Sequence, residues 1–85
     1  LNGFLASIEC EEFTNAHYFK RVIEEHFYNE NETYFRIVYL WAEGLLDSKQ
    51  GRVKGGQKKM EDAVRIFEML GCNKSAEYYR KTTDA

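Results

Sequence analysis

The sequence contains no proline, so the residue that most strongly interrupts helices is missing. Its 85 residues also contain no apolar run long enough to cross a membrane and no segment with the pattern of a signal peptide. Cys10 and Cys72 are the only cysteines, and neither has a Cys-x-x-Cys context. We therefore expect two buried or half-buried thiols in a reducing, cytoplasmic setting, and not a zinc site or a disulfide.

Positive charge is not in excess either. The 12 basic and 14 acidic residues give a net charge of −2, so bulk attraction to nucleic acid is not expected. No glycine-rich phosphate loop, Ser/His/Asp order or metal-ligand spacing occurs, and His17 and His26 are too far apart to hold a metal from adjacent turns. The neighbouring pairs Glu11–Glu12 and Glu24–Glu25 favour solvated faces over an acid/base couple. The sequence therefore predicts no enzyme and no cofactor.

What the chain does contain is an ordinary share of apolar residues, 44%, and a high share of aromatic residues, 15%. Together with the lack of proline, this composition favours an all-α fold. A chain of this length forms one small domain that buries roughly 60–65% of its unfolded surface. We predict a single domain over residues 1–85 with about five helices. Because the chain begins with Leu1 and not Met, we expect a fragment of a longer protein.

Two helices are predicted in the first part of the chain. Apolar residues over positions 1–8 have the i, i+3, i+4, i+7 spacing of one helix face. Thr14 is predicted to cap a second helix that extends to about Tyr28. The buried face of that second helix is expected to consist of Ala16, Phe19, Val22, Ile23, His26 and Phe27.

Glycines separate three further helices in the second part. The third helix is predicted over residues 32–49, with Gly51 just past its end, where glycine accepts a left-handed conformation at little cost. The fourth is predicted over residues 52–70 and ends at Gly71, and Asn73 is predicted to cap the fifth. The expected inner faces are Tyr34, Ile37, Val38, Trp41, Leu45 and Ser48, then Val53, Gly56, Met60, Ala63, Val64, Phe67 and Leu70, then Ala76, Tyr79 and Thr83.

Glycines inside helices require another explanation. Gly55 and Gly56 together cost about 2 kcal/mol relative to alanines in a helix interior. Close approach of two helix backbones, with Gly44 against Gly56, is the physical reason that we favour. We therefore interpret Gly44, Gly51, Gly56 and Gly71 as structural glycines and not as ligand residues.

The paired helices resemble the tetratricopeptide repeat, which has the pattern W-x2-L-G-x2-Y…A-x3-F…P in 34 residues. The positions that fall on this pattern are Leu40, Glu43, Gly44, Asp47, Gly56 and Met60. Gly44 alone matches by identity, and no proline closes the pattern. The resemblance implies stacked antiparallel helix pairs that form a right-handed superhelix.

A narrower resemblance lies in Gly44, in the connection from Gly51 to Gly56, in the segment MEDAVRIFEMLGC over residues 60–72 and in the tail SAEYY over residues 75–79. These stretches resemble the C-terminal domain of the Rgg/GadR/MutR transcriptional regulators of Gram-positive bacteria. The resemblance implies a homodimer, an N-terminal helix-turn-helix domain outside this chain as the only contact with DNA, and binding of short hydrophobic signal peptides in a concave groove. The alternative is a tetratricopeptide-type adaptor that binds a partner protein and is unrelated to transcription.

The first helix of each stacked pair lines the concave surface of such a repeat, so peptide contacts are predicted in the third helix. The predicted set is Tyr34, Val38, Trp41, Leu45 and Ser48. The alternative, which we favour for Trp41, is a core position, and both interpretations stay open. A basic cluster is either a solvated turn or a docking surface for an anionic partner, and it consists of Lys49, Arg52, Lys54, Lys58 and Lys59.

Overall fold

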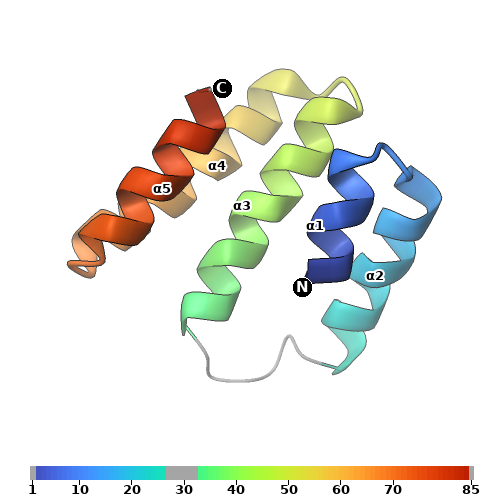
Figure 1. Ribbon diagram of the computed structural model, residues 1–85, viewed down its shortest axis with the longest axis horizontal. Coiled ribbons are helices and arrows are strands. Elements are labelled where there is room, and N and C mark those ends of the chain that lie inside the picture. Colours follow the sequence, from blue (N-terminus) through green and yellow to red (C-terminus); the bar gives the residue numbers. More distant parts are fainter. Residues whose placement is uncertain (1, 27–32, 85) are drawn as a thin grey trace.

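A computed structural model describes residues 2–26 and 33–84, and every regular element in these ranges is a helix (Figure 1). The helices are α1 (Asn2–Glu9), α2 (Phe13–His26), α3 (Thr33–Lys49), α4 (Val53–Met69) and α5 (Asn73–Asp84). Successive helices are antiparallel, so α1 pairs with α2 and α3 pairs with α4. The predicted all-α architecture of packed helix pairs is confirmed.

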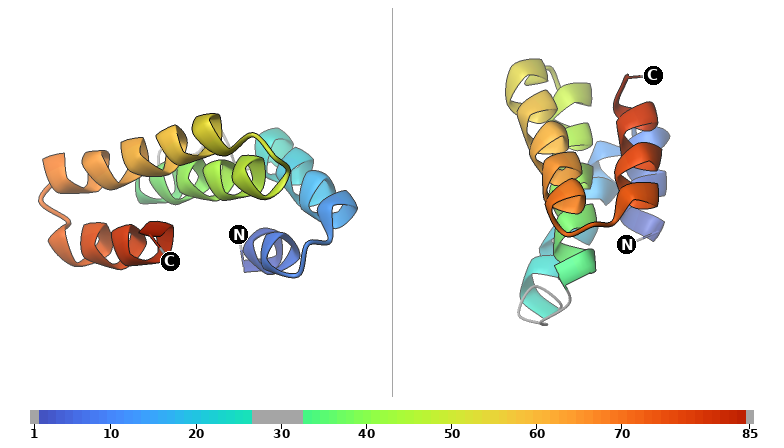
Figure 2. Two further views of the ribbon diagram at one scale, coloured as in Figure 1. Left: turned by 90° about the horizontal axis from the view of Figure 1, so that it is seen from above. Right: turned by 90° about the vertical axis from the view of Figure 1, so that its left-hand side faces the viewer.

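The long helix α3 lies at the centre of the molecule. It packs against α4 along one side, while α1 and α5 lie on another side of it (Figure 2). Helix α5 also packs against α4, and α1 packs against α2. A helix with neighbours on two sides must bury two stripes, and α3 accordingly supplies residues to two separate clusters of the core.

The first cluster joins α3, α4 and α5, and α3 contributes Ile37, Val38 and Trp41 to it. The second joins α1, α2 and α3, and here α3 contributes Tyr39, Ala42 and Leu46. This second stripe was missing from the prediction, which assigned one inner face to α3. Leu5 and Leu45 are half-buried and pack against both clusters, so the two halves of the core are continuous.

Helices α3 and α4 approach so closely that two glycines touch. A Cβ atom added to Gly44 would lie 2.5 Å from the carbonyl oxygen of Gly56 and 2.9 Å from the backbone nitrogen of Met60. A Cβ atom added to Gly56 would press on the carbonyl oxygen of Gly44 and lie 2.7 Å from the backbone nitrogen of Ser48. Neither position can hold a side chain without separating the helices. Gly55 differs, because a Cβ atom there meets open space.

Three turns between helices share one backbone geometry. Each has a left-handed residue after the preceding helix, with φ of 58° at Glu11, 97° at Gly51 and 78° at Gly71. Each shows the two hydrogen bonds of a Schellman motif. These bonds are Glu11 N to Ile8 O and Glu12 N to Ser7 O, Gly51 N to Ser48 O and Arg52 N to Asp47 O, and Gly71 N to Glu68 O and Cys72 N to Phe67 O.

This shared turn fixes where the next helix begins. In all three cases one residue separates the left-handed residue from the helix, so α2 begins at Phe13 and α5 begins at Asn73. The predicted caps at Thr14 and Asn73 are therefore wrong, since both residues already lie inside their helices. The geometry of the preceding helix end overrides the preference of Thr and Asn for the capping position.

The burial predictions for Val53, Leu70 and the two cysteines are also wrong. Val53 and Leu70 were expected on the inner face of α4, but they are 47% and 55% exposed because they lie at its two ends, beside the turns. Cys10 and Cys72 were expected to be at least half-buried, but both lie in the turns and are exposed. In α2, Ala16 and Ile23 are buried as predicted, whereas Phe27 and Tyr28 lie outside the described residues, as does the side chain of His26.

Candidate functional site

The five residues predicted to contact a peptide differ in how accessible they are. Val38 and Trp41 are each only 3% exposed and belong to the core cluster beneath α4 and α5. Tyr34, at the start of α3, is 55% exposed. Leu45 and Ser48 are half-buried. The structure thus brings Tyr34 and part of Leu45 to the surface, while the protein's own helices cover the other apolar residues of the set.

Trp41 is held by α5. Its indole Nε1 donates a hydrogen bond to Thr83 Oγ1 at 2.8 Å, and the Thr83 hydroxyl in turn donates to the backbone oxygen of Tyr79 at 2.6 Å. The indole also lies 5.1 Å from the ring of Tyr79. A buried tryptophan normally satisfies its N–H group in this way. Trp41 therefore occupies a core position in this structure and ties α5 to α3.

Tyr79 is the centre of an aromatic cluster. Its ring stacks on Phe67 at 5.5 Å and meets Tyr78 edge-on at 5.0 Å, while Tyr34 packs against Phe67 at 5.4 Å. Burial, followed by the adjacent phenol of Tyr34, raises the pKa of Tyr79 to about 12. Its hydroxyl therefore stays protonated at neutral pH, and a ligand that contacts Tyr79 meets a neutral phenol.

Ser48 faces the helix crossing and not the solvent. Its Oγ is buried without a hydrogen-bond partner among the described residues, and it lies against the position where Gly56 has no side chain. An unsatisfied buried hydroxyl costs about 1–3 kcal/mol. The small volume of serine at this crossing is what the packing of α4 requires.

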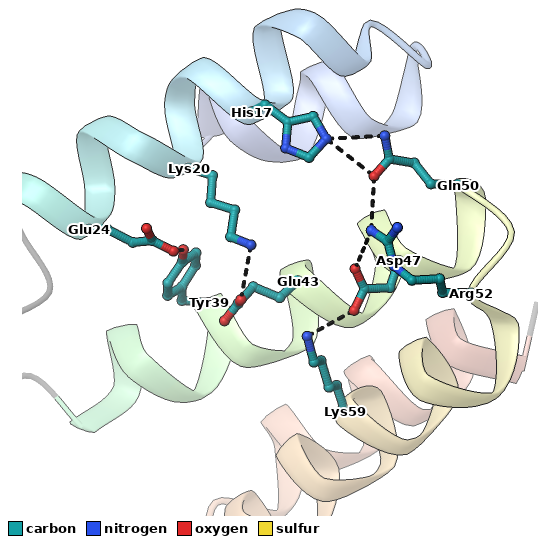
Figure 3. A network of polar contacts seen from close by, with 9 residues as sticks. All are labelled: His17, Lys20, Glu24, Tyr39, Glu43, Asp47, Gln50, Arg52 and Lys59. Atoms are coloured by element: carbon teal, nitrogen blue, oxygen red, sulfur yellow. Dashed lines mark hydrogen bonds and ion pairs between the residues drawn. The ribbon is translucent and has the colours of Figure 1, made fainter.

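A polar seam of three contacts runs between α2 and α3 (Figure 3). The side chains of His17 and Gln50 are hydrogen-bonded at 3.1–3.2 Å. Lys20 forms an ion pair with Glu43 at 3.5 Å, and the hydroxyl of Tyr39 donates a hydrogen bond to Glu24 at 3.0 Å. On α2 these residues lie three and four positions apart, on one helix face. Sequence reasoning missed the seam because neither helix alone shows which polar residues face each other.

The basic cluster is partly neutralised within the chain. Asp47 accepts a hydrogen bond from Lys59 at 2.8 Å and one from Arg52 at 3.0 Å. Burial alone raises the pKa of Asp47, but these two bonds outweigh it and leave the pKa below its ordinary value. Lys49, Lys54 and Lys58 are exposed, and no ion pair is seen for them within residues 2–26 and 33–84.

A groove of about 300 Å³ lies between α4 and α5. It is lined by Glu61, Val64, Arg65, Glu68, Arg80 and Thr83. An ion pair between Arg80 and Glu68 spans the two helices. None of the five predicted peptide contacts lines this groove, and its charged lining is unlike the mostly apolar lining of ordinary ligand pockets.

The described part of the chain contains no group of three His, Cys, Asp or Glu residues arranged to hold a metal ion. In that same part, no helix has both the length and the apolar character that crossing a bilayer requires. The features that remain are therefore surfaces formed by helix faces and turns.

Comparison with known families identifies what kind of domain these helices form. Residues 1–81 match the family model of the C-terminal domain of the HTH-type transcriptional regulator Rgg. The chain belongs to the Rgg C-terminal domain family. No curated protein matches it. Because the chain belongs to this family, it is the C-terminal domain of a transcriptional regulator. The family match also confirms the resemblance that the glycines and the MEDAVRIFEMLGC segment indicated.

Proposed function

We propose that this Rgg domain is a cytoplasmic regulatory module that forms homodimers and binds a short hydrophobic peptide, while a separate helix-turn-helix domain contacts DNA. The observation that carries the proposal is the family match over residues 1–81. It favours a regulator over the alternative of an adaptor unrelated to transcription. The exposed and half-buried apolar residues of α3 supply a surface on which such a peptide can lie.

The proposed peptide surface is the side of α3 that α1 and α5 flank (Figure 2). Leu5 and Leu45, both half-buried, pack against both core clusters and keep part of their apolar surface exposed to solvent. Tyr34, at the start of α3, offers an aromatic ring with a polar tip. Burying such groups under apolar peptide side chains stabilises a complex by about 25 cal/mol for each Å² removed from water. In this arrangement Trp41 lies beneath the peptide, so its fluorescence responds to binding although its side chain does not contact the peptide.

Titration with a panel of short hydrophobic peptides tests the binding proposal, with calorimetry and Trp41 fluorescence as independent measurements. We expect at least one peptide to bind and Tyr34→Ala to weaken it about tenfold, the loss typical of an interfacial aromatic residue. Tyr18→Ala is the matched control, because Tyr18 is 61% exposed on α2 and Tyr34 is 55% exposed. Equal affinity of both variants would remove Tyr34 from the site, and a folded domain that binds none of the peptides would refute peptide binding.

Sedimentation equilibrium of the chain at micromolar concentration tests dimerisation separately. The monomer has a mass of 10.0 kDa, so a dimer doubles the observed mass. Observation of the monomer alone at every concentration would contradict the proposal for this chain.

A further inference from the structure

Two turns at one end of the domain carry charge of opposite sign. The acidic turn, between α1 and α2, consists of Glu9, Glu11 and Glu12, all exposed. The first basic residue of the sequence does not occur until Lys20. The basic turn, between α3 and α4, contains the exposed residues Lys49, Arg52, Lys54 and Lys58. No acidic residue lies between Asp47 and Glu61.

The two turns are neighbours in space. His17, in the second turn of α2, reaches Gln50 at the end of α3, with 3.1 Å between their side-chain nitrogens. Both turns lie at the upper right of the molecule in Figure 1. Within one copy, no ion pair joins the acidic turn to the basic turn among the described residues. Arg52 pairs with Asp47 of its own chain, while the remaining charged side chains of both turns are exposed to solvent and open to a partner.

The basic turn is unfavourable for an isolated chain. Lys54 and Lys58 are four residues apart on α4, where like charges repel each other. The first turn of α4 contains no acidic residue, although the positive end of a helix favours one. An anionic partner offsets the repulsion between the two lysines and places negative charge at the positive end of α4. Val53 is 47% exposed in the same turn and adds an apolar contact to any surface that docks there.

We propose that the acidic and basic turns form a reciprocal contact between two copies of this chain. A two-fold axis brings identical patches together, and a patch with adjacent halves of opposite sign is complementary to itself. Each acidic turn then lies on the partner's basic turn, and the contact forms twice. The inference rests on the proposed homodimer and specifies which surface joins the copies, with charge pairing that sets the orientation of the two subunits.

Charge reversal tests this pairing. Lys54→Glu/Lys58→Glu makes both turns acidic, and Glu11→Lys/Glu12→Lys makes both basic, so each variant alone repels a second copy of itself. We expect each to weaken the dimer about tenfold or more in low salt, as measured by sedimentation equilibrium. A 1:1 mixture of the two variants restores both contacts at once, because every basic turn again meets an acidic one. The mixture should regain wild-type affinity, and added salt should weaken it as it weakens the wild type.

The control is Arg21→Glu/Lys74→Glu, which changes the net charge by the same amount at exposed positions outside both turns. It should leave the dimer unchanged. A wild-type dimer that resists both reversals, or a pair of weakened variants that mixing fails to restore, would overturn the reciprocal contact and leave the homodimer standing. A monomeric wild-type chain would overturn both, and binding of duplex DNA by that monomer would assign the basic turn to nucleic acid. If a reversal variant fails to fold, Lys54→Gln/Lys58→Gln decides the same question through the salt dependence.

Discussion

Replacing Gly56 by alanine measures how much of the fold depends on the close crossing of α3 and α4. Alanine has the better helix propensity by about 1 kcal/mol, so propensity alone predicts stabilisation. The new methyl group, however, would lie 2.7 Å from the backbone nitrogen of Ser48 and against the carbonyl oxygen of Gly44. Ordinary contacts of a Cβ atom begin at 3.4 Å. The nitrogen of Ser48 and the oxygen of Gly44 are both backbone atoms, so they cannot move aside unless α3 itself shifts.

The two helices must therefore separate by roughly 1 Å or more, which loosens the packing on both sides of the crossing. Overpacking of a core typically costs about 1–3 kcal/mol, and loss of the crossing places this substitution at the upper end. After the gain in propensity is subtracted, we expect a net loss of about 2 kcal/mol. For a domain of this size, that loss corresponds to a fall of roughly 8–16 °C in the melting temperature.

The neighbouring glycine provides a matched control. A Cβ atom at Gly55 meets nothing within 4 Å, so Gly55→Ala should raise the free energy of unfolding by about 1 kcal/mol. Urea unfolding followed by Trp41 fluorescence and by circular dichroism measures both variants. Gly44→Ala should resemble Gly56→Ala, and the double variant should lose less than the sum of the two, since the first methyl group already separates the helices. A Gly56→Ala domain as stable as the wild type would refute the argument.

Two further predictions concern the turns and the aromatic cluster. Glu11 adopts φ of 58°, where glycine is favoured, so Glu11→Gly should raise the free energy of unfolding by about 1 kcal/mol in urea unfolding, and a lower value would contradict the inferred left-handed strain. The pKa of Tyr79 is raised from 10.0 to about 12, so the folded state disfavours its ionised form. The resulting stability is fully present below pH 10 and is lost as the pH rises through about 12. Tyr79→Phe should therefore flatten the alkaline part of the curve of stability against pH, and an unchanged slope would exclude Tyr79 as the group responsible.

Helix existence and type followed from local features of the sequence. Absence of proline, apolar spacing and glycines at positions 51 and 71 predicted helices close to α3, α4 and α5, because each of these signals acts within one or two turns of the chain. Inner residues of α4 such as Met60, Ala63 and Phe67 are buried as expected. Errors occurred at helix starts, where the shared turn geometry decided the boundary.

The candidate site was much less predictable. Tyr34 and Trp41 share one predicted face of α3, yet one is 55% exposed and the other 3%. The difference arises from α5, which covers Trp41 and supplies Thr83 as its hydrogen-bond partner. Helical periodicity predicts which residues share a face, but it does not predict which other helix covers that face. Peptide binding by this set of residues therefore stays a prediction.

The sequence by itself determined the all-α class, the order of the helices, the need for glycine at the crossing and the family. These properties depend on neighbouring residues and on a linear pattern that a family model can match. Only the tertiary structure decided that α3 is buried on two sides. It also decided that polar residues of α2 and α3 form a seam (Figure 3), and that the acidic and basic turns lie at one end of the domain (Figure 1). The physical reason is that such contacts join residues far apart in the chain, and their partners are chosen by how the helices pack.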